Sequence, residues 1–234
     1  MGKEVRPLIL RKRPSVQLYH GDCMGVLRGL RTNSVHAVVT DPPYGISYQW
    51  GSNPKIINDG RPFIWWLWDS ARVLKSGGAL VCFCRWDVQH AFRSAIELAG
   101  LRVRGQWVWD RKWWGIPNPT TLLPRHDVMW FATKGRFKFP GKIPPSLIQV
   151  PSILGPKRVH PTEKPAELMR QLVRFVTPHR GVVLDPCMGS GATGAAVVDG
   201  FGFTGIEIDR KFYRAAVKRL RRVIKERRRG HAVE

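Results

Sequence analysis

The chain of 234 residues contains few cysteines and no long apolar run. Its four cysteines are Cys23, Cys82, Cys84 and Cys187. They form neither a CxxC pair nor a series with metal-ligand spacing, which argues against a disulfide framework or a structural metal site and favours free thiols. No segment is long and apolar enough to cross a bilayer, and the first residues lack the pattern of a signal peptide. We therefore expect a soluble cytoplasmic protein without a metal.

Acidic side chains are also scarce. Seventeen Asp and Glu stand against thirty-nine Lys and Arg, which gives a formal net charge of +22 at pH 7. An imbalance of this size favours polyanionic partners, with nucleic acid ahead of an anionic membrane. The alternative is a basic surface that is merely solvated.

Short β-branched runs alternate with helix-spaced apolar patterns along most of the chain. Strands are predicted at 35–40, 79–84, 101–109, 181–184 and 203–208, with a further strand compatible with 127–132; helices are predicted at 62–75, 87–99, 165–176, 192–198 and 210–228. This alternation is typical of an α/β, Rossmann-like domain with a mostly parallel sheet and helices on both faces. We expect a single domain over residues 1–234, with Trp65, Trp66 and Trp68 in its core.

The alternation breaks between residues 111 and 160, where eight of the eighteen prolines lie and no helix-length pattern occurs. We expect an irregular insertion there. Aromatic and basic side chains in it are candidates for contacts to nucleic-acid bases and phosphates. The candidates are Trp113, Trp114, Arg125, Arg136 and Lys138.

A glycine-rich turn, DPCMGSG at residues 185–191, follows one predicted strand and opens a helix. Glycines let a ligand approach the backbone, and a helix start offers free N–H groups. Glu207 ends the next predicted strand, where a carboxylate can accept hydrogen bonds from ribose hydroxyls. The chain has no GxxxxGK[ST] motif, and Asp185 disfavours a phosphate. A cofactor with an adenosine end and a positive centre, such as S-adenosylmethionine, fits this turn; an ordinary strand–helix turn is the alternative.

A second Asp-Pro junction, DPPYG at residues 41–45, ends the predicted strand 35–40. The exocyclic amine of adenine or cytosine is a poor nucleophile because its lone pair is delocalised into the ring. The Asp41 carboxylate and the Pro42 carbonyl can accept its two hydrogens and direct the lone pair. Pro42 and Pro43 fix the backbone, and Tyr44 offers a face for stacking. Such a site serves a base only after the base leaves the helix stack. A plain Pro-Pro turn is the alternative.

The two Asp-Pro junctions predict a common cleft. In an open α/β sheet, ligands bind beyond the carboxyl ends of the strands, where the winding reverses. We therefore expect strands 35–40 and 181–184 to be neighbours. An amine held at Asp41 then faces a methyl group held near Asp185, and transfer depends mainly on proximity and orientation.

Five sequence blocks together resemble the DNA amino methyltransferases, the family that methylates adenine N6 or cytosine N4. The blocks are LYHGDCMGVLRGL at 18–30, DPPY at 41–44, HPTEKP at 160–165, DPCMGSGAT at 185–193 and GIEID at 205–209. Their order, with the catalytic half first, is that of the beta group. The resemblance implies a seven-stranded sheet, a target recognition region in the insertion, catalysis at DPPY, and S-adenosylmethionine as cofactor. The cofactor residues that it implies are Asp22, Thr162, Lys164, Asp185, Pro186, Cys187, Gly189, Ser190, Gly191, Thr193 and Glu207.

The resemblance, with Asp rather than Ser at position 41, predicts a site-specific methyltransferase for adenine N6 in double-stranded DNA, of the kind found in restriction-modification systems. A cytosine-N4 enzyme and an RNA adenine enzyme are the alternatives within this chemistry. A catalytically inactive nucleic-acid-binding protein is the alternative from another class. The short insertion makes a homodimer a possible assembly.

Overall fold

The computed structural model describes residues 5–12, 14–47, 56–113, 119–120, 122–153, 163–197 and 200–230. Nine strands occur in this part of the chain: β1 (Leu8–Lys12), β2 (Ser15–His20), β3 (Val35–Thr40), β4 (Leu74–Cys84), β5 (Arg102–Asp110), β6 (His126–Thr133), β7 (Leu147–Gln149), β8 (Val182–Asp185) and β9 (Gly202–Glu207). The helices are α1 (Cys23–Gly29), α2 (Trp66–Val73), α3 (Gln89–Leu98), α4 (Ala166–Val176), α5 (Ala192–Val197) and α6 (Arg210–Gly230).

All nine strands form one sheet in the order β1-β2-β9-β8-β3-β4-β6-β5-β7. β1 pairs antiparallel with β2, and β6 pairs antiparallel with β4 and β5, whereas the other pairs are parallel. The predicted α/β, mostly parallel architecture is confirmed. The expected number of seven strands is wrong, because the short strands β1 and β7 extend the two edges of a seven-stranded centre.

β3 and β8 are adjacent and parallel, with Ala37 opposite Val183 and Val38 opposite Leu184. From β3 the chain continues through α2 to β4, on one side of this pair. From β8 it continues through α5 to β9, on the other side. The winding therefore reverses between β3 and β8, as the two Asp-Pro junctions predicted, and both junctions lie at the same edge of the sheet.

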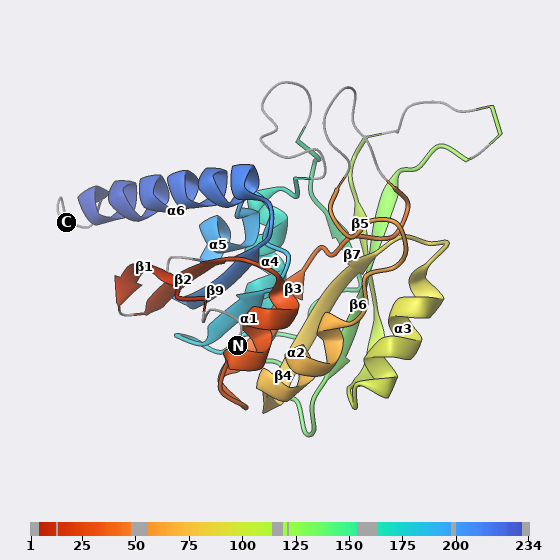
Figure 1. Cartoon of the computed structure of the whole chain (residues 1–234). Helices are drawn as coiled ribbons and strands as arrows, with labels where there is room; N and C mark the ends of the chain where they lie inside the picture. Colours follow the sequence, from red (N-terminus) through yellow and green to blue (C-terminus); the bar gives the residue numbers. More distant parts are fainter. Residues whose placement is uncertain are drawn as a thin grey trace.

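The helices form a layer on each face of the sheet (Figure 1). α4, α5 and α6 pack on one face against alternate strand residues such as Val39 and Val183, which belong to one buried cluster. α1, α2 and α3 pack on the other face against residues such as Val38 and Leu184, which belong to a second cluster. Successive strand residues point to opposite faces, so strands covered on both sides are apolar throughout. This explains why β3 and β8 appear as continuous β-branched runs in the sequence.

The tryptophan-rich helix differs from its prediction. α2 begins at Trp66 rather than near Pro62, and the chain passes into β4 at Leu74. Trp66 is fully buried, but Trp65 is 52% and Trp68 is 41% exposed, so the core placement predicted for these two side chains is wrong. Neighbouring residues on a helix point in directions about 100° apart, and three closely spaced side chains cannot all face the sheet.

The sequence pattern also failed to indicate β1, β2, α1 and β7. The segment predicted as an irregular insertion, 111–160, contains β6 and β7, and β6 lies between β4 and β5 inside the sheet. The irregular part of this segment is therefore shorter than expected. Among the described residues, no helix is long and apolar enough to span a membrane.

Candidate active site

Asp41 lies directly after β3 and is held by two side chains from different parts of the chain. The Tyr44 hydroxyl donates a hydrogen bond to Asp41 Oδ1. Lys164 Nζ lies 2.8 Å from Asp41 Oδ2 in an ion pair whose side chains are only 9% and 18% exposed. Lys164 also lies over the Phe83 ring, 4.9 Å from its centre. The carboxylate of Asp41 is thus oriented through both of its oxygens.

Tyr44 is held as a hydrogen-bond donor. Burial and the negative charge of Asp41 raise the pKa of its hydroxyl well above the usual value, so the hydroxyl keeps its proton. Its ring meets the edge of Phe92, with the ring centres 6.5 Å apart. Tyr44 therefore orients Asp41, a contact that was not predicted from the sequence.

The backbone after Asp41 turns sharply. The Pro43 carbonyl accepts a hydrogen bond from the N–H of Phe63, at 3.3 Å. No donor to the Pro42 carbonyl occurs in the part of the chain that the structure describes. Gly45 has φ +85°, and its N–H donates to the buried carboxylate of Asp59 at 2.7 Å. The turn is fixed while the Pro42 carbonyl stays available, as the amine-binding hypothesis requires.

Asp185 ends β8 beside Asp41 and is 2% exposed. Its Oδ1 accepts a hydrogen bond from Thr40 Oγ1 at 2.8 Å, and its Oδ2 accepts one from Thr193 Oγ1 at 2.6 Å. The N–H of Cys187 donates to Oδ1 at 3.2 Å. Burial raises the pKa of Asp185 to about 6 despite these donors. Asp185 therefore joins β3, β8 and α5 from inside the protein.

Glu207 ends β9, the next strand, and is 8% exposed. Gly189 N–H donates to its Oε2 at 2.8 Å, and Asp209 N–H donates to its Oε1 at 2.7 Å. Burial raises the pKa of Glu207 to about 7. Each carboxylate oxygen has a second acceptor position. Glu207 can therefore fix the glycine-rich turn and still accept hydrogen bonds from a ligand.

The glycine-rich turn has a backbone conformation that favours glycine at two positions. Gly189 and Gly191 have φ +51° and +80°, values that favour glycine. A Cβ on Gly191 would lie 2.9 Å from the Leu220 side chain of α6.

Asp22 lies near this turn, since it follows β2 and the N–H of Gly21 donates to the Glu207 carbonyl at 2.9 Å. Asp22 is exposed and caps α1 through the N–H of Met24 at 3.1 Å. Pro186 and Ser190 are buried within the turn.

The structure separates the predicted DNA-contact residues into two groups. Trp113 follows β5, and Arg125 precedes β6, at the edge of the sheet that carries Asp41. Arg125 is paired with Asp110 at 3.0 Å. Arg136 and Lys138 follow the antiparallel strand β6 and therefore lie at the opposite edge, away from Asp41. Their placement gives the predicted DNA contact no support.

Some predicted residues lie outside the described part of the chain, namely Trp114 and Thr162. Lys164 was predicted to hold the cofactor, but its ammonium group lies on Asp41. Among the described residues, no group of three or more His, Cys, Asp or Glu side chains is placed to hold a metal ion.

One exposed aromatic side chain at this edge escaped the sequence analysis. Trp86 follows β4, the neighbour of β3, and is 71% exposed. Its turn is held by the ion pair of Arg85 and Asp87, with Nε and Oδ1 2.8 Å apart, and by a hydrogen bond from Val88 N–H to the Arg85 carbonyl at 3.2 Å. The only signal in the sequence that could have indicated Trp86 was its position just after the predicted strand 79–84.

The fold and these two Asp-Pro sites are those of an α/β methyltransferase. The family model described as DNA methylase, of the N6 and N4 type, matches residues 35–152 and 144–218. The chain therefore belongs to the DNA methylase family, which comprises amino methyltransferases that use S-adenosylmethionine.

Individual relatives agree with this assignment. The chain is 32% identical over 221 residues to a putative methylase, YubD, of Escherichia coli K12, and the match covers 91% of this chain and 93% of that protein. A crystal structure of an M1.HpyAVI–SAM complex superposes with a TM-score of 0.70 at 25% identity, covering 88% of this chain and all of that one. The PvuII DNA methyltransferase, a cytosine-N4-specific enzyme, shares the fold, with a TM-score of 0.71 at 18% identity and coverage of 87% and 85%.

Proposed function

We propose that this DNA methylase transfers a methyl group from S-adenosylmethionine to the N6 amine of an adenine that has left the DNA helix. The observation that carries the proposal is the position of Asp41 beside Asp185 at the reversal between β3 and β8. The amine acceptor and the cofactor turn then open on one edge of the sheet. An Asp at position 41, rather than the Ser of some cytosine enzymes, favours adenine.

Asp41 and the Pro42 carbonyl act on the amine. Tyr44 and Lys164 hold Asp41 through both oxygens, and each oxygen keeps a second acceptor position for an amine hydrogen. The Pro42 carbonyl accepts the other hydrogen. This pair localises the lone pair of the nitrogen, and Asp41 is placed to accept the proton that the nitrogen loses after transfer. Lys164 is a positioning residue here, because it acts through Asp41.

The residues near β8 and β9 fit S-adenosylmethionine. Glu207 would accept hydrogen bonds from the ribose hydroxyls, and the glycine turn at Gly189 and Gly191 would let the cofactor approach the backbone. Asp22, which follows β2 next to the end of β9, is expected to contact the adenine. Asp185 is enclosed by Thr40 and Thr193, so it shapes the turn from within. When bound, S-adenosylmethionine would supply an electrophilic methyl group and would leave as S-adenosylhomocysteine.

DNA meets the same edge of the sheet. Trp86, Trp113 and Arg125 lie there and are candidates for contacts to bases and phosphates. An exposed indole beside the site is suited to stack on a base near the vacated position, because base–aromatic stacking needs no particular base.

Mass analysis of nucleosides from DNA treated with the protein and S-adenosylmethionine tests the target. We expect N6-methyladenine. The appearance of N4-methylcytosine alone would show that the cytosine-N4 alternative is correct. Methylation of RNA but not of duplex DNA would favour the RNA alternative.

Two substitutions test the site. We expect Asp41→Asn to lower turnover by about a hundredfold or more, since it removes the charged acceptor. Lys164→Gln should lower turnover as well, and both variants should bind S-adenosylmethionine like the unchanged protein. If Lys164→Gln instead weakened cofactor binding and left turnover at saturating cofactor intact, Lys164 would hold the cofactor rather than Asp41.

A further inference from the structure

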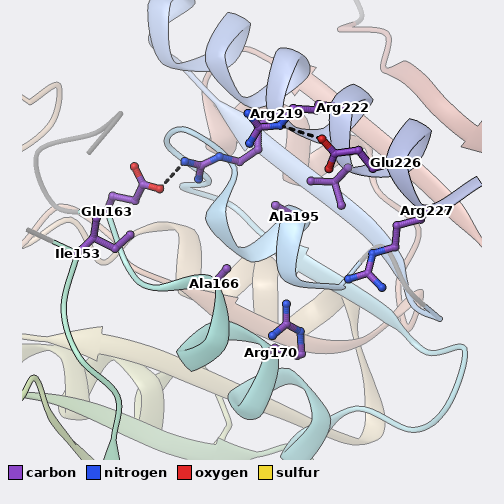
Figure 2. A pocket seen from close by; sticks show the side chains of 10 residues that line it. Ile153, Glu163, Ala166, Arg170, Ala195, Arg219, Arg222, Glu226 and Arg227 are labelled. Atoms are coloured by element: carbon purple, nitrogen blue, oxygen red, sulfur yellow. Dashed lines mark hydrogen bonds and ion pairs between the residues drawn. The ribbon is translucent and has the colours of Figure 1, made fainter. Parts of the chain in front are cut away.

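A groove of about 610 Å³ lies outside the candidate active site, between α4, α5 and α6 (Figure 2). Arg170 of α4 and Arg219, Arg222 and Arg227 of α6 line it, together with Glu163 and Glu226. The small side chains of Ala166 and Ala195 lie between the two sides of the groove. Arg170 and Arg227 extend into the space from opposite sides (Figure 2). We call these lining residues the arginine groove.

The groove carries an excess of positive charge. Four arginines against two glutamates leave a formal charge of +2 (4 − 2). The pairs differ in how firmly they are held. Arg219 is bound to Glu163, and their side chains are only 15% and 5% exposed. Arg222 lies 3.7 Å from Glu226, with side chains 71% and 64% exposed, and Arg170 pairs with Glu167, which is 53% exposed.

These differences determine which arginines can take a ligand. Exposed ion pairs contribute little, on the order of 0–1 kcal/mol, so a stronger anion can displace the glutamate. A phosphate accepts paired N–H donors from a guanidinium in the same way that a carboxylate does. Arg170 and Arg222 can therefore turn to a phosphate, while the buried pair of Arg219 and Glu163 holds the groove in shape.

One end of the groove adjoins, along the chain, the lysine that holds the catalytic carboxylate. Glu163 lines the groove, and the next residue, Lys164, pairs with Asp41. Consecutive Cα atoms are about 3.8 Å apart. DNA carries a phosphate every ~1.7 Å of helix axis, counting both strands. A duplex bound at Asp41 extends beyond the flipped base on both sides, and its phosphates are the polyanion that the positive charge of the groove suits.

We propose that the arginine groove binds the phosphate backbone of the DNA substrate beside the flipped base, through Arg170 and Arg222. This inference rests on the proposed function for its substrate, and it extends the DNA contact to the face formed by α4 and α6. The contact is to the backbone, so it strengthens binding to every sequence.

The test compares two double variants that lose the same charge. Arg170→Ser with Arg222→Ser empties the groove of its two loosely paired arginines. Arg221→Ser with Lys225→Ser removes two exposed positive charges of α6 that do not line the groove. Duplex affinity is measured between about 50 and 200 mM salt. Thermal unfolding and S-adenosylmethionine binding confirm that both proteins are folded.

We expect the groove variant to bind every duplex more weakly and to reduce the slope of log K against log salt by about 1.8, or 0.9 for each lost phosphate contact. The α6 control should change the slope by much less. Equal slopes in the two variants would overturn the inference and leave the methyl transfer untouched. A groove variant that changed only the molecular mass in light scattering would also overturn it, by showing that a second copy occupies the groove.

The outcomes distinguish this inference from the proposed function. If DNA binding depended on the groove but treated DNA contained no N6-methyladenine, the groove would stand and the proposed target would fail.

Discussion

Asp185 and Glu207 end the neighbouring strands β8 and β9, and their carboxylates differ in the donors that they bind. Asp185 is enclosed and accepts hydrogen bonds from Thr40, Thr193 and Cys187, so its task is internal. Glu207 lies at the next strand end with only two backbone donors. Burial raises the pKa of both groups, to about 6 and about 7. Glu207 keeps one acceptor position on each oxygen, whereas Asp185 keeps only one, on Oδ2, and is 2% exposed.

The raised pKa of Glu207 predicts a pH-dependent cofactor affinity. Ribose hydroxyls donate to the ionised carboxylate, so bound cofactor lowers this pKa and binding releases a proton. Affinity for S-adenosylmethionine should therefore rise with pH up to about 7 and then level off. Below pH 7 it should fall by at most about tenfold per pH unit.

Isothermal titration calorimetry measures how the affinity for S-adenosylmethionine depends on pH. A range of about pH 5.5 to 8.5 covers one to two units on either side of the Glu207 pKa. The Glu207→Gln variant is the control, because it cannot ionise. It should bind more weakly, with a flatter pH profile. An unchanged profile in this variant would assign the dependence to another group such as Asp185.

At the scale of elements, the turn after β3 is the most constrained part of the site. Gly45 has φ +85°, and a Cβ at this position would lie 2.1 Å from the backbone carbon of Arg61. The Asp59 carboxylate accepts hydrogen bonds from the N–H groups of Gly45 and Ile46, so the segment around Asp59 packs against the turn after β3. The position of Asp41 depends on this packing.

Gly45→Ala should therefore displace the turn. We expect it to destabilise the protein by about 1–3 kcal/mol, the usual cost of local backbone strain, and to lower methyl transfer. Cofactor affinity should change little, because the cofactor turn follows β8. The matched control is Gly60→Ala, where a Cβ meets nothing within 4 Å. Activity of Gly45→Ala equal to that of the control would contradict this dependence on packing.

Prediction at this scale succeeded where an element is buried on both faces. β3 was predicted with its observed bounds, and β8 and β9 within one residue, because a strand covered by helices on both sides is apolar throughout. β1 and β7 were missed because they are short strands at the two edges of the sheet, where pairing with a neighbour and not a local pattern decides their structure. β2 was missed although it has six residues and lies inside the sheet, because its polar and apolar side chains do not form a continuous apolar run.

At the scale of the whole molecule, one buried hydrogen bond joins the catalytic and cofactor halves. Thr40 Oγ1 donates to Asp185 Oδ1 at 2.8 Å across residues that are 145 positions apart. Thr40 is fully buried, so water cannot replace the lost partner. The two halves therefore share stability as well as the cleft.

Thr40→Val should lower the free energy of unfolding by about 1–3 kcal/mol, since Asp185 then loses a donor in the interior. Each kcal/mol lowers Tm by about 2–4 °C in a chain of this size. Thr177→Val is the control, because Thr177 is also buried but its Oγ1 has no partner among the described residues. Denaturant unfolding followed by circular dichroism measures both. Equal stability of the two variants would show that the bond contributes nothing.

The sequence by itself determined the α/β class, the two Asp-Pro junctions and the acidic end of β9, because each is written in a local pattern of apolar runs, glycines and prolines. Only the tertiary structure decided that Lys164 lies on Asp41 and that Arg136 and Lys138 lie at the opposite edge. Contacts between residues more than a hundred positions apart, and the direction of the strand that carries a loop, depend on strand order and pairing. No local pattern encodes these two properties.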